Sequence, residues 1–207
     1  MIVSHKHRYI FFAVPKTATQ SIRQALQAHL GPNDWQQHAM FGQSTLPVPA
    51  LASLGHGHIS FQQATRHLAP EHLNNYYKFA FVRHPFDRFV SAAAFLLGNE
   101  PDFQRNPTAL MKSAMSRPRF RNRVLISPQS DLLMDSSGNS GMDFIGRYET
   151  LQSDFTHVLK HIGLPADVLP EVNTSEHGAY QDYLDAELTS QLTAFYERDF
   201  ALLGYSV

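Results

Sequence analysis

The chain contains no cysteine. A disulfide framework is therefore excluded, and the fold has to hold by packing alone. A run of about 18 apolar residues is also missing, so we expect no transmembrane helix. The first eight residues, Met1 to Arg8, lack the apolar core of a signal peptide. These features favour a cytoplasmic protein.

An excess of one charge is absent as well. Lysine and arginine number 17 and aspartate and glutamate 18, which gives a net charge of −1. The composition therefore does not indicate a whole-protein attraction to nucleic acid. The length of 207 residues suits one α/β domain with a substantial core, spanning residues 1–207.

The most informative segment present lies near the amino terminus. The apolar run 9–14 predicts a strand, residues 15–21 a tight turn, and residues 22–30 a helix that stops at Gly31. The first N–H groups of a helix lack internal partners and carry partial positive charge, so this turn is suited to a phosphate or sulfate. Lys16 adds a full charge, and Thr17, Thr19 and Ser21 add hydroxyl donors.

This turn is not a Walker A loop, because the Gly-x-x-x-x-Gly-Lys-Ser/Thr spacing is missing and the turn has no glycine at all. On this segment alone, an ordinary strand-to-helix connection remains an equal alternative to an anion site.

A second motif follows another short apolar strand, predicted over residues 78–82. Arg83 comes at its carboxyl end, where open α/β sheets bind ligands. Pro85 suits the first turn of a helix that continues to Gly98, and it places Ser91 about two turns beyond Arg83. A guanidinium fork and a hydroxyl suit a second phosphate. The alternative, favoured for Arg88, is a structural ion pair with Asp87 or a contact with a helix end.

In this order, the two motifs resemble the sulfotransferases that use 3′-phosphoadenosine-5′-phosphosulfate (PAPS). The similarity is greatest to their carbohydrate branch, which includes heparan sulfate 2-O-sulfotransferase. Three later segments agree with that branch: Ser127-Pro128-Gln129, residues 143–151 and residues 196–205. The resemblance implies a P-loop-like α/β fold with a parallel sheet flanked by helices.

It also implies the cosubstrate contacts. The residues matching the 5′-phosphosulfate loop are Pro15, Lys16, Thr17, Ala18, Thr19, Gln20 and Ser21. Arg83 and Ser91 match the 3′-phosphate ligands. The chain departs from the family pattern at Ala18 and Gln20, where many relatives carry glycine and serine or threonine.

The acceptor side is assigned from the segment Gly55-His56-Gly57-His58. Relatives carry a similar His-Gly-His segment whose second histidine is the catalytic base, so the resemblance implies His58 as the base and His56 as an assisting residue. An imidazole with an ordinary pKa near ~6.5 suits removal of a hydroxyl proton. The alternatives are a chance pair in a histidine-rich chain, a metal pair, and a structural cap.

The resemblance implies transfer of the sulfuryl group from PAPS to an acceptor hydroxyl, with a saccharide favoured as the acceptor and no metal required. Two other classes stay open: a P-loop-type ATP-dependent phosphotransferase and a non-catalytic nucleotide-binding protein. The oligomeric state is not predicted.

Several further residues and elements complete the predictions. The roles of Arg147, Glu149, Gln129 and the basic cluster Arg117, Arg119, Arg121 and Arg123 stay undecided between site contacts and structure. The patterns also indicate a short strand at 124–126, a strand at 143–147, an amphipathic helix at 149–162, a helix over 184–203, and helix breaks at Pro107 and Pro118.

Overall fold

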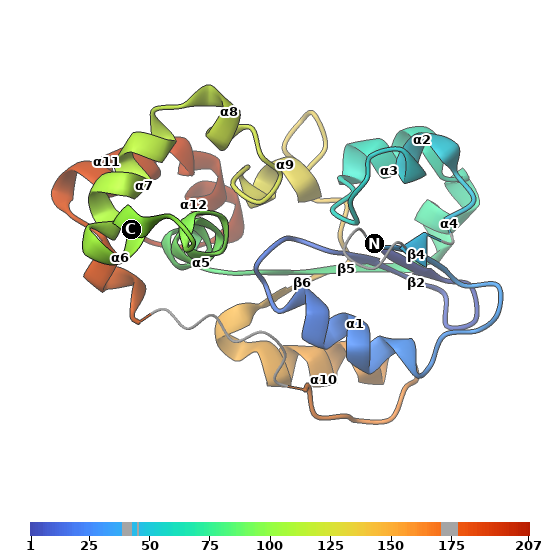
Figure 1. The fold of residues 1–207 in the computed structure, drawn as a ribbon. Helices are drawn as coiled ribbons and strands as arrows, with labels where there is room; N and C mark the ends of the chain where they lie inside the picture. Colours follow the sequence, from blue (N-terminus) through green and yellow to red (C-terminus); the bar gives the residue numbers. More distant parts are fainter. Residues whose placement is uncertain (39–42, 45, 171–177) are drawn as a thin grey trace. The chain divides into compact units, whose positions relative to one another are not determined.

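The protein is described by a computed structural model covering residues 1–38, 43–44, 46–170 and 178–207. The chain forms two compact units, one of residues 1–82 and 131–172 and the other of residues 83–130 and 173–207. Figure 1 follows the chain through both, and the α/β class expected from the sequence is confirmed.

The first unit is built on a six-stranded sheet with the order β4-β3-β1-β2-β5-β6. Its strands are β1 (Ile2–Ser4), β2 (Tyr9–Phe12), β3 (Trp35–His38), β4 (Gln43–Ser44), β5 (Tyr77–Val82) and β6 (Phe144–Arg147). Its helices are α1 (Thr19–Gln27), α2 (Pro49–Ala52), α3 (Phe61–His67), α4 (Pro70–Asn75) and α10 (Leu151–His161), with a 3₁₀ turn at Tyr148–Thr150.

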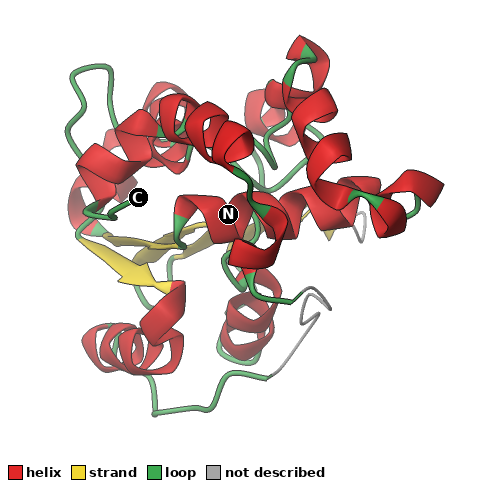
Figure 2. Ribbon diagram, turned by 90° about the vertical axis from the view of Figure 1, so that its left-hand side faces the viewer, coloured by secondary structure: helices red, strands yellow, loops and turns green. Residues whose placement is uncertain are grey.

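The centre of the sheet is parallel, as expected, because β2, β5 and β6 run in the same direction. The other strands correct the expectation of a parallel sheet, since β1 pairs antiparallel with both β2 and β3, and β3 with β4. Only residues 5–8 connect β1 to β2, and a connection this short can join only antiparallel neighbours. Figure 2 shows these strands as one layer between helices.

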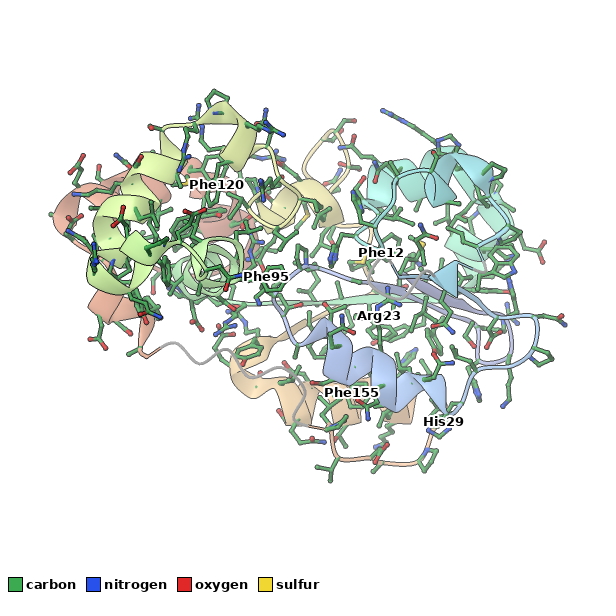
Figure 3. All side chains as sticks on the ribbon, in the orientation of Figure 1. Phe12, Arg23, His29, Phe95, Phe120 and Phe155 are labelled. Carbon is green, nitrogen blue, oxygen red and sulfur yellow. The ribbon has the colours of Figure 1, made fainter. Side chains whose placement is uncertain are left out.

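Alternation along the strands directs side chains to the two faces of the sheet. Phe11 stacks on Phe79, with ring centroids 5.2 Å apart, and both pack with Phe155 of α10 in one buried cluster. Phe12 points to the other face and meets Phe61 of α3 at 6.1 Å. Accordingly, α1 and α10 cover one face and α2 to α4 the other, with Phe12 and Phe155 on opposite sides (Figures 1 and 3).

The register of the central strands positions the candidate site. Phe12 of β2 lies opposite Ala80 of β5, so the carboxyl ends of these two strands lie side by side. The loop that follows β2 therefore emerges at the edge where α/β sheets bind ligands.

The second unit is helical. It contains α5 (Pro85–Leu97), α6 (Pro101–Arg105), α7 (Pro107–Met115), α8 (Pro118–Arg121), α11 (Ala186–Phe195) and α12 (Glu197–Leu203), a 3₁₀ turn at Tyr180–Tyr183, and the start of α9 (Gln129–Leu133), along which the chain returns to the first unit. Proline occupies the first turn of α5, α6, α7 and α8, where no internal N–H bond is lost. The expected breaks at Pro107 and Pro118 are confirmed.

Two expectations for this unit are wrong. The expected helix 184–203 is broken at Tyr196, whose hydroxyl donates to the carbonyl of Ile126 at 2.7 Å. The expected strand 124–126 is a series of turns, because the guanidinium of Arg88 takes the carbonyls of Leu125 and Ile126 that a sheet would otherwise pair.

Candidate active site

The loop between β2 and α1 is shaped by its own side chains. The hydroxyls of Thr17 and Thr19 both donate to the carbonyl of Val14, at 2.9 and 2.6 Å. Because each hydroxyl has one proton, these two groups do not offer a donor to an anion in this arrangement. From the sequence we interpreted these hydroxyls as hydrogen-bond donors to a bound anion. In the structure they fix the conformation of the loop instead.

Two residues of this loop have left-handed backbone conformations without being glycine. The φ angle is 66° at Lys16 and 58° at Ala18. Alanine at such an angle is strained by of order 1–2 kcal/mol. Ala18 is the position at which the resemblance expects glycine, so the left-handed turn of this loop persists without the residue that favours it.

Helix α1 begins directly after Ala18, whose methyl group cannot cap it. No side chain caps this helix end, and its first turn holds no acidic residue. Thr19 and Ser21 are buried in that first turn. The chain thus leaves the partial positive charge of the helix start without a carboxylate of its own, which suits a bound anion.

His58 lies against the same strand end. Its Nδ1 donates to the carbonyl of Ala13 at 2.7 Å, since a carbonyl can only accept. In the neutral ring this leaves Nε2 unprotonated and able to accept a proton. Burial lowers the pKa of His58 to about 3, and the charge of Arg23 contributes to the same effect. The sequence expectation of an ordinary pKa is thereby corrected.

His56 lies beside it, with the ring centroids of the two histidines 6.1 Å apart. Burial also lowers the pKa of His56, so both rings favour the neutral form. The buried Nδ1 of His56 has no hydrogen-bond partner among the described residues. The His-Gly-His segment therefore brings two neutral imidazoles to the strand end that carries the loop of Lys16.

Gly57 allows this segment to approach the sheet closely. A Cβ atom at Gly57 would lie 2.2 Å from the carbonyl oxygen of Gln37 and 2.9 Å from Nη2 of Arg23. Neither distance is possible for a real side chain, so this position requires glycine.

Arg23 is the residue of this site that sequence reasoning missed. It is buried on α1, and its Nη2 donates to the carbonyls of Gln37 at 2.7 Å and Met1 at 3.3 Å. Figure 3 shows it directed from α1 toward the strands. Its Nε and Nη1 have no partner within the described ranges, and burial lowers its pKa to about 10. The sequence signal that could have revealed this residue is its position, because a charged residue directly follows the apolar Ile22 within α1.

In the second unit, Arg83 forms a fork on Asp87. Its Nε and Nη2 donate to the two carboxylate oxygens at 2.6 and 2.8 Å. Ser91 is buried four residues after Asp87, on the same face of α5. The structural pairing considered as the alternative for Arg83 is thus present, and it aligns the guanidinium with the helix face that carries Ser91.

Gln129 has a structural role, which is one of the two alternatives left open by the sequence. Its side-chain amide accepts from the backbone N–H of Arg83 at 3.0 Å and donates to the carbonyl of Arg83 at 2.9 Å. The backbone N–H groups of Gln129 and Ser130 donate to the buried carboxylate of Asp199 at 2.9 and 2.8 Å. Two segments that carry the family resemblance therefore meet here to hold the backbone of Arg83.

Arg88 is fully buried and has a structural role, but its partners are neither Asp87 nor a helix end, as the sequence had suggested. Its guanidinium donates to the carbonyls of Leu125, Ile126 and Ser127, and lies 5.5 Å from the ring of Tyr196.

In the first unit, the backbone N–H of Arg147 donates to the carboxylate of Asp154 at 2.8 Å.

Among the described residues, no group of three or more histidine, cysteine or acidic side chains is placed to hold a metal ion. No helix in the described ranges is long and apolar enough to cross a membrane.

Comparison with known proteins gives the class. A model described as the sulfotransferase family matches residues 1–206, which include both compact units. The chain belongs to the sulfotransferase family. No solved structure matches it significantly.

Curated relatives are similar at low identity. Carbohydrate sulfotransferase 11 of Danio rerio is 23% identical, with 100% of this chain and 67% of the relative covered. Carbohydrate sulfotransferase 10 of Xenopus laevis is 24% identical, with 99% and 67% covered. Carbohydrate sulfotransferase 14 of Danio rerio is 25% identical, with 99% and 62% covered. The chain thus spans about two thirds of the length of these relatives.

Proposed function

We propose that this protein is a sulfotransferase that moves the sulfuryl group of PAPS to a hydroxyl of a saccharide acceptor. Family membership and the names of the carbohydrate sulfotransferase relatives support the reaction and the acceptor class. The observation that carries the proposal is the bond from His58 to Ala13, three residues before Lys16. It joins a proton acceptor to an anion-binding loop.

The residues present fit PAPS by their chemistry. The loop from Pro15 to Ser21 has a lysine and an uncapped helix start, which suit the 5′-phosphosulfate. Arg83 and Ser91 are both buried and suit the 3′-phosphate. When bound, PAPS supplies an activated sulfuryl group and a phosphate leaving group.

Each residue then has a defined task. Lys16 and the loop N–H groups stabilise negative charge on the leaving oxygen. His58 receives the acceptor hydroxyl proton at Nε2, because Nδ1 is occupied by its bond to Ala13. His56, neutral and adjacent, assists in orienting the acceptor. Arg23 and Gly57 hold the histidine segment in place.

The test is transfer of labelled sulfate from PAPS to a panel of saccharides with free hydroxyls. Lys16→Ala should lower kcat by about 10²–10³-fold, as loss of one oxyanion donor does. His58→Asn keeps an N–H for the carbonyl of Ala13 but cannot accept the proton, and it should be comparably impaired. Full activity in His58→Asn would reject the assigned base.

Binding separates the two other classes. Binding of adenosine 3′,5′-bisphosphate without binding of ATP and magnesium supports the sulfotransferase. The reverse preference would indicate a phosphotransferase, and nucleotide binding without turnover of any acceptor would indicate a non-catalytic protein.

A further inference from the structure

A short basic segment in the second unit has no part in the site described above. Helix α8 is preceded by Arg117, contains Arg119 and Arg121, and is followed by Arg123. We call these four residues the α8 arginine ridge. Arg117, Arg119 and Arg123 are exposed, and Arg121 is half-buried.

The ridge carries its charge without compensation from the rest of the described chain. None of its four arginines forms an ion pair with a described residue. Lys112, just upstream, differs because it pairs with Asp185 and Glu187 at 2.8 and 2.7 Å.

The spacing makes this arrangement unfavourable in the isolated protein. The four arginines occupy alternate positions in and beside the four-residue helix α8, and like charges this close together repel one another. The whole chain has a net charge of −1, so four uncompensated cations within seven residues are a local feature. A polyanion bound there would relieve the repulsion.

The ridge is held firmly from the inside. Phe120, between the arginines, is 7% exposed and belongs to the core cluster of this unit, into which Figure 3 shows it pointing. Just after the ridge, Arg88 binds the carbonyls of residues 125–127. Gln129 then binds the backbone of Arg83. The arginines are thus presented on a scaffold fixed to the Arg83 motif.

We propose that the α8 arginine ridge binds the repeating carboxylate or sulfate groups of an acidic polysaccharide, and so holds a polymeric acceptor. This inference rests on the proposed function for the identity of the acceptor. Guanidinium groups bind both anions through paired N–H donors. The aromatic residue of the segment, Phe120, is buried in the core and not available for stacking on bases, so a nucleic acid fits less well.

Binding can be tested without PAPS. The probes are dextran sulfate, carboxymethyl dextran and neutral dextran of equal length, measured at increasing salt. We expect the wild type to bind both charged dextrans and not the neutral one. Arg119→Gln with Arg123→Gln should weaken binding at least tenfold and reduce its salt dependence. The control pair is Arg66→Gln with Arg105→Gln, which removes the same charge from exposed positions elsewhere and should leave binding unchanged.

Equal binding by the wild type and the ridge variant would overturn the proposal, as would tighter binding of single-stranded RNA of equal charge.

Kinetic measurements separate this inference from the proposed function. The ridge variant should raise KM for a charged polymer acceptor at least tenfold and leave KM for PAPS and transfer to a short neutral saccharide unchanged. A raised KM for PAPS would contradict the ridge assignment, while absence of all transfer together with ridge-dependent polymer binding would contradict the proposed function alone.

Discussion

At His58, one backbone contact determines which imidazole nitrogen can accept a proton. The carbonyl of Ala13 fixes the hydrogen on Nδ1, and burial keeps the ring neutral by lowering its pKa to about 3. A neutral ring is ready to act as a base at pH 7, but it is a weaker base than an exposed histidine. A bound anion nearby would raise this pKa and strengthen the base.

The buried neutral histidine predicts a pH dependence of stability. An unfolded histidine has a pKa near ~6.5, so above that value neither state binds the proton and the stability is fully present. As pH falls from about 6.5 toward about 3, His58 binds a proton in the unfolded chain but not in the folded protein. The free energy of unfolding should then fall by up to about 1.4 kcal/mol per pH unit.

The measurement is urea unfolding of the wild type and His58→Asn between about pH 7 and pH 4. The variant keeps an N–H donor for Ala13 but does not titrate, so its stability should depend less on pH. His67→Asn, at an exposed position, should retain the wild-type dependence. Identical pH profiles for the wild type and His58→Asn would show that His58 is not held neutral.

Gly57 gives a second prediction for a single residue. A methyl group there would collide with the carbonyl of Gln37 and with Arg23, so Gly57→Ala should destabilise the protein by about 1–3 kcal/mol or displace the histidine segment. Gly31→Ala is the matched control, because its added Cβ would come no closer than 3.4 Å to any described neighbouring atom. Chemical denaturation measures the stability of both variants, and equal destabilisation by the two substitutions would contradict the close approach at Gly57.

At the scale of elements, the loop before α1 carries backbone strain that one substitution can remove. Ala18 has a φ of 58°, and glycine there loses the steric penalty but adds entropy to the unfolded chain. Ala18→Gly should therefore stabilise the protein by about 0.5–1 kcal/mol. The control, Ala28→Gly, changes an alanine with a φ of −65° at the other end of α1 and should destabilise. The midpoints of urea unfolding measure the stability of the two variants relative to the wild type. Destabilisation by Ala18→Gly would show that Ala18 is not strained.

The elements predicted from sequence were those with strong local signals. The apolar run of β5, the proline starts of α7 and α8, and the spacing of α10 each specify their own structure. Strands β1 and β3 were missed because they are short and their burial depends on neighbours distant in sequence. The break between α11 and α12 was missed, and the bond that the hydroxyl of Tyr196 makes at this position reaches Ile126, 70 residues away, which no local pattern shows.

The same distinction applies to the site. The loop around Lys16 and the His-Gly-His segment could be predicted as site residues because adjacent residues in the sequence carry their chemistry. Arg23 was not assigned, because its role depends on which carbonyl groups the fold brings to it. The lowered pKa of His58 was missed for a related reason, since burial is a tertiary property.

At the scale of the whole chain, the resemblance to sulfotransferases is distributed over segments that this structure uses for support. Gln129 bonds to the backbone of Arg83, and Asp199 in turn holds the backbone of Gln129. A motif shared across a family can therefore record how a ligand residue is positioned. In this chain, two such segments join residues 46 and 70 positions apart.

Asp199 gives the prediction at this scale. Its buried carboxylate accepts two backbone N–H groups, so Asp199→Ala should destabilise the protein by about 2–3 kcal/mol and weaken binding of adenosine 3′,5′-bisphosphate through Arg83. Glu197→Ala removes a nearby exposed carboxylate and should do neither. Thermal unfolding with and without the nucleotide measures both effects, and wild-type behaviour of Asp199→Ala would refute the role.

The carbonyl of Val14, which receives both threonine hydroxyls, has a practical consequence. Because the turn is held in shape by its own side chains, its conformation does not depend on a bound ligand, and it can be moved to another protein as a unit. Residues 9–27 could be grafted onto another parallel sheet and keep the shape of this turn, provided that Thr17 and Thr19 are included. The remaining positions of the turn would then be open to redesign for a chosen ligand.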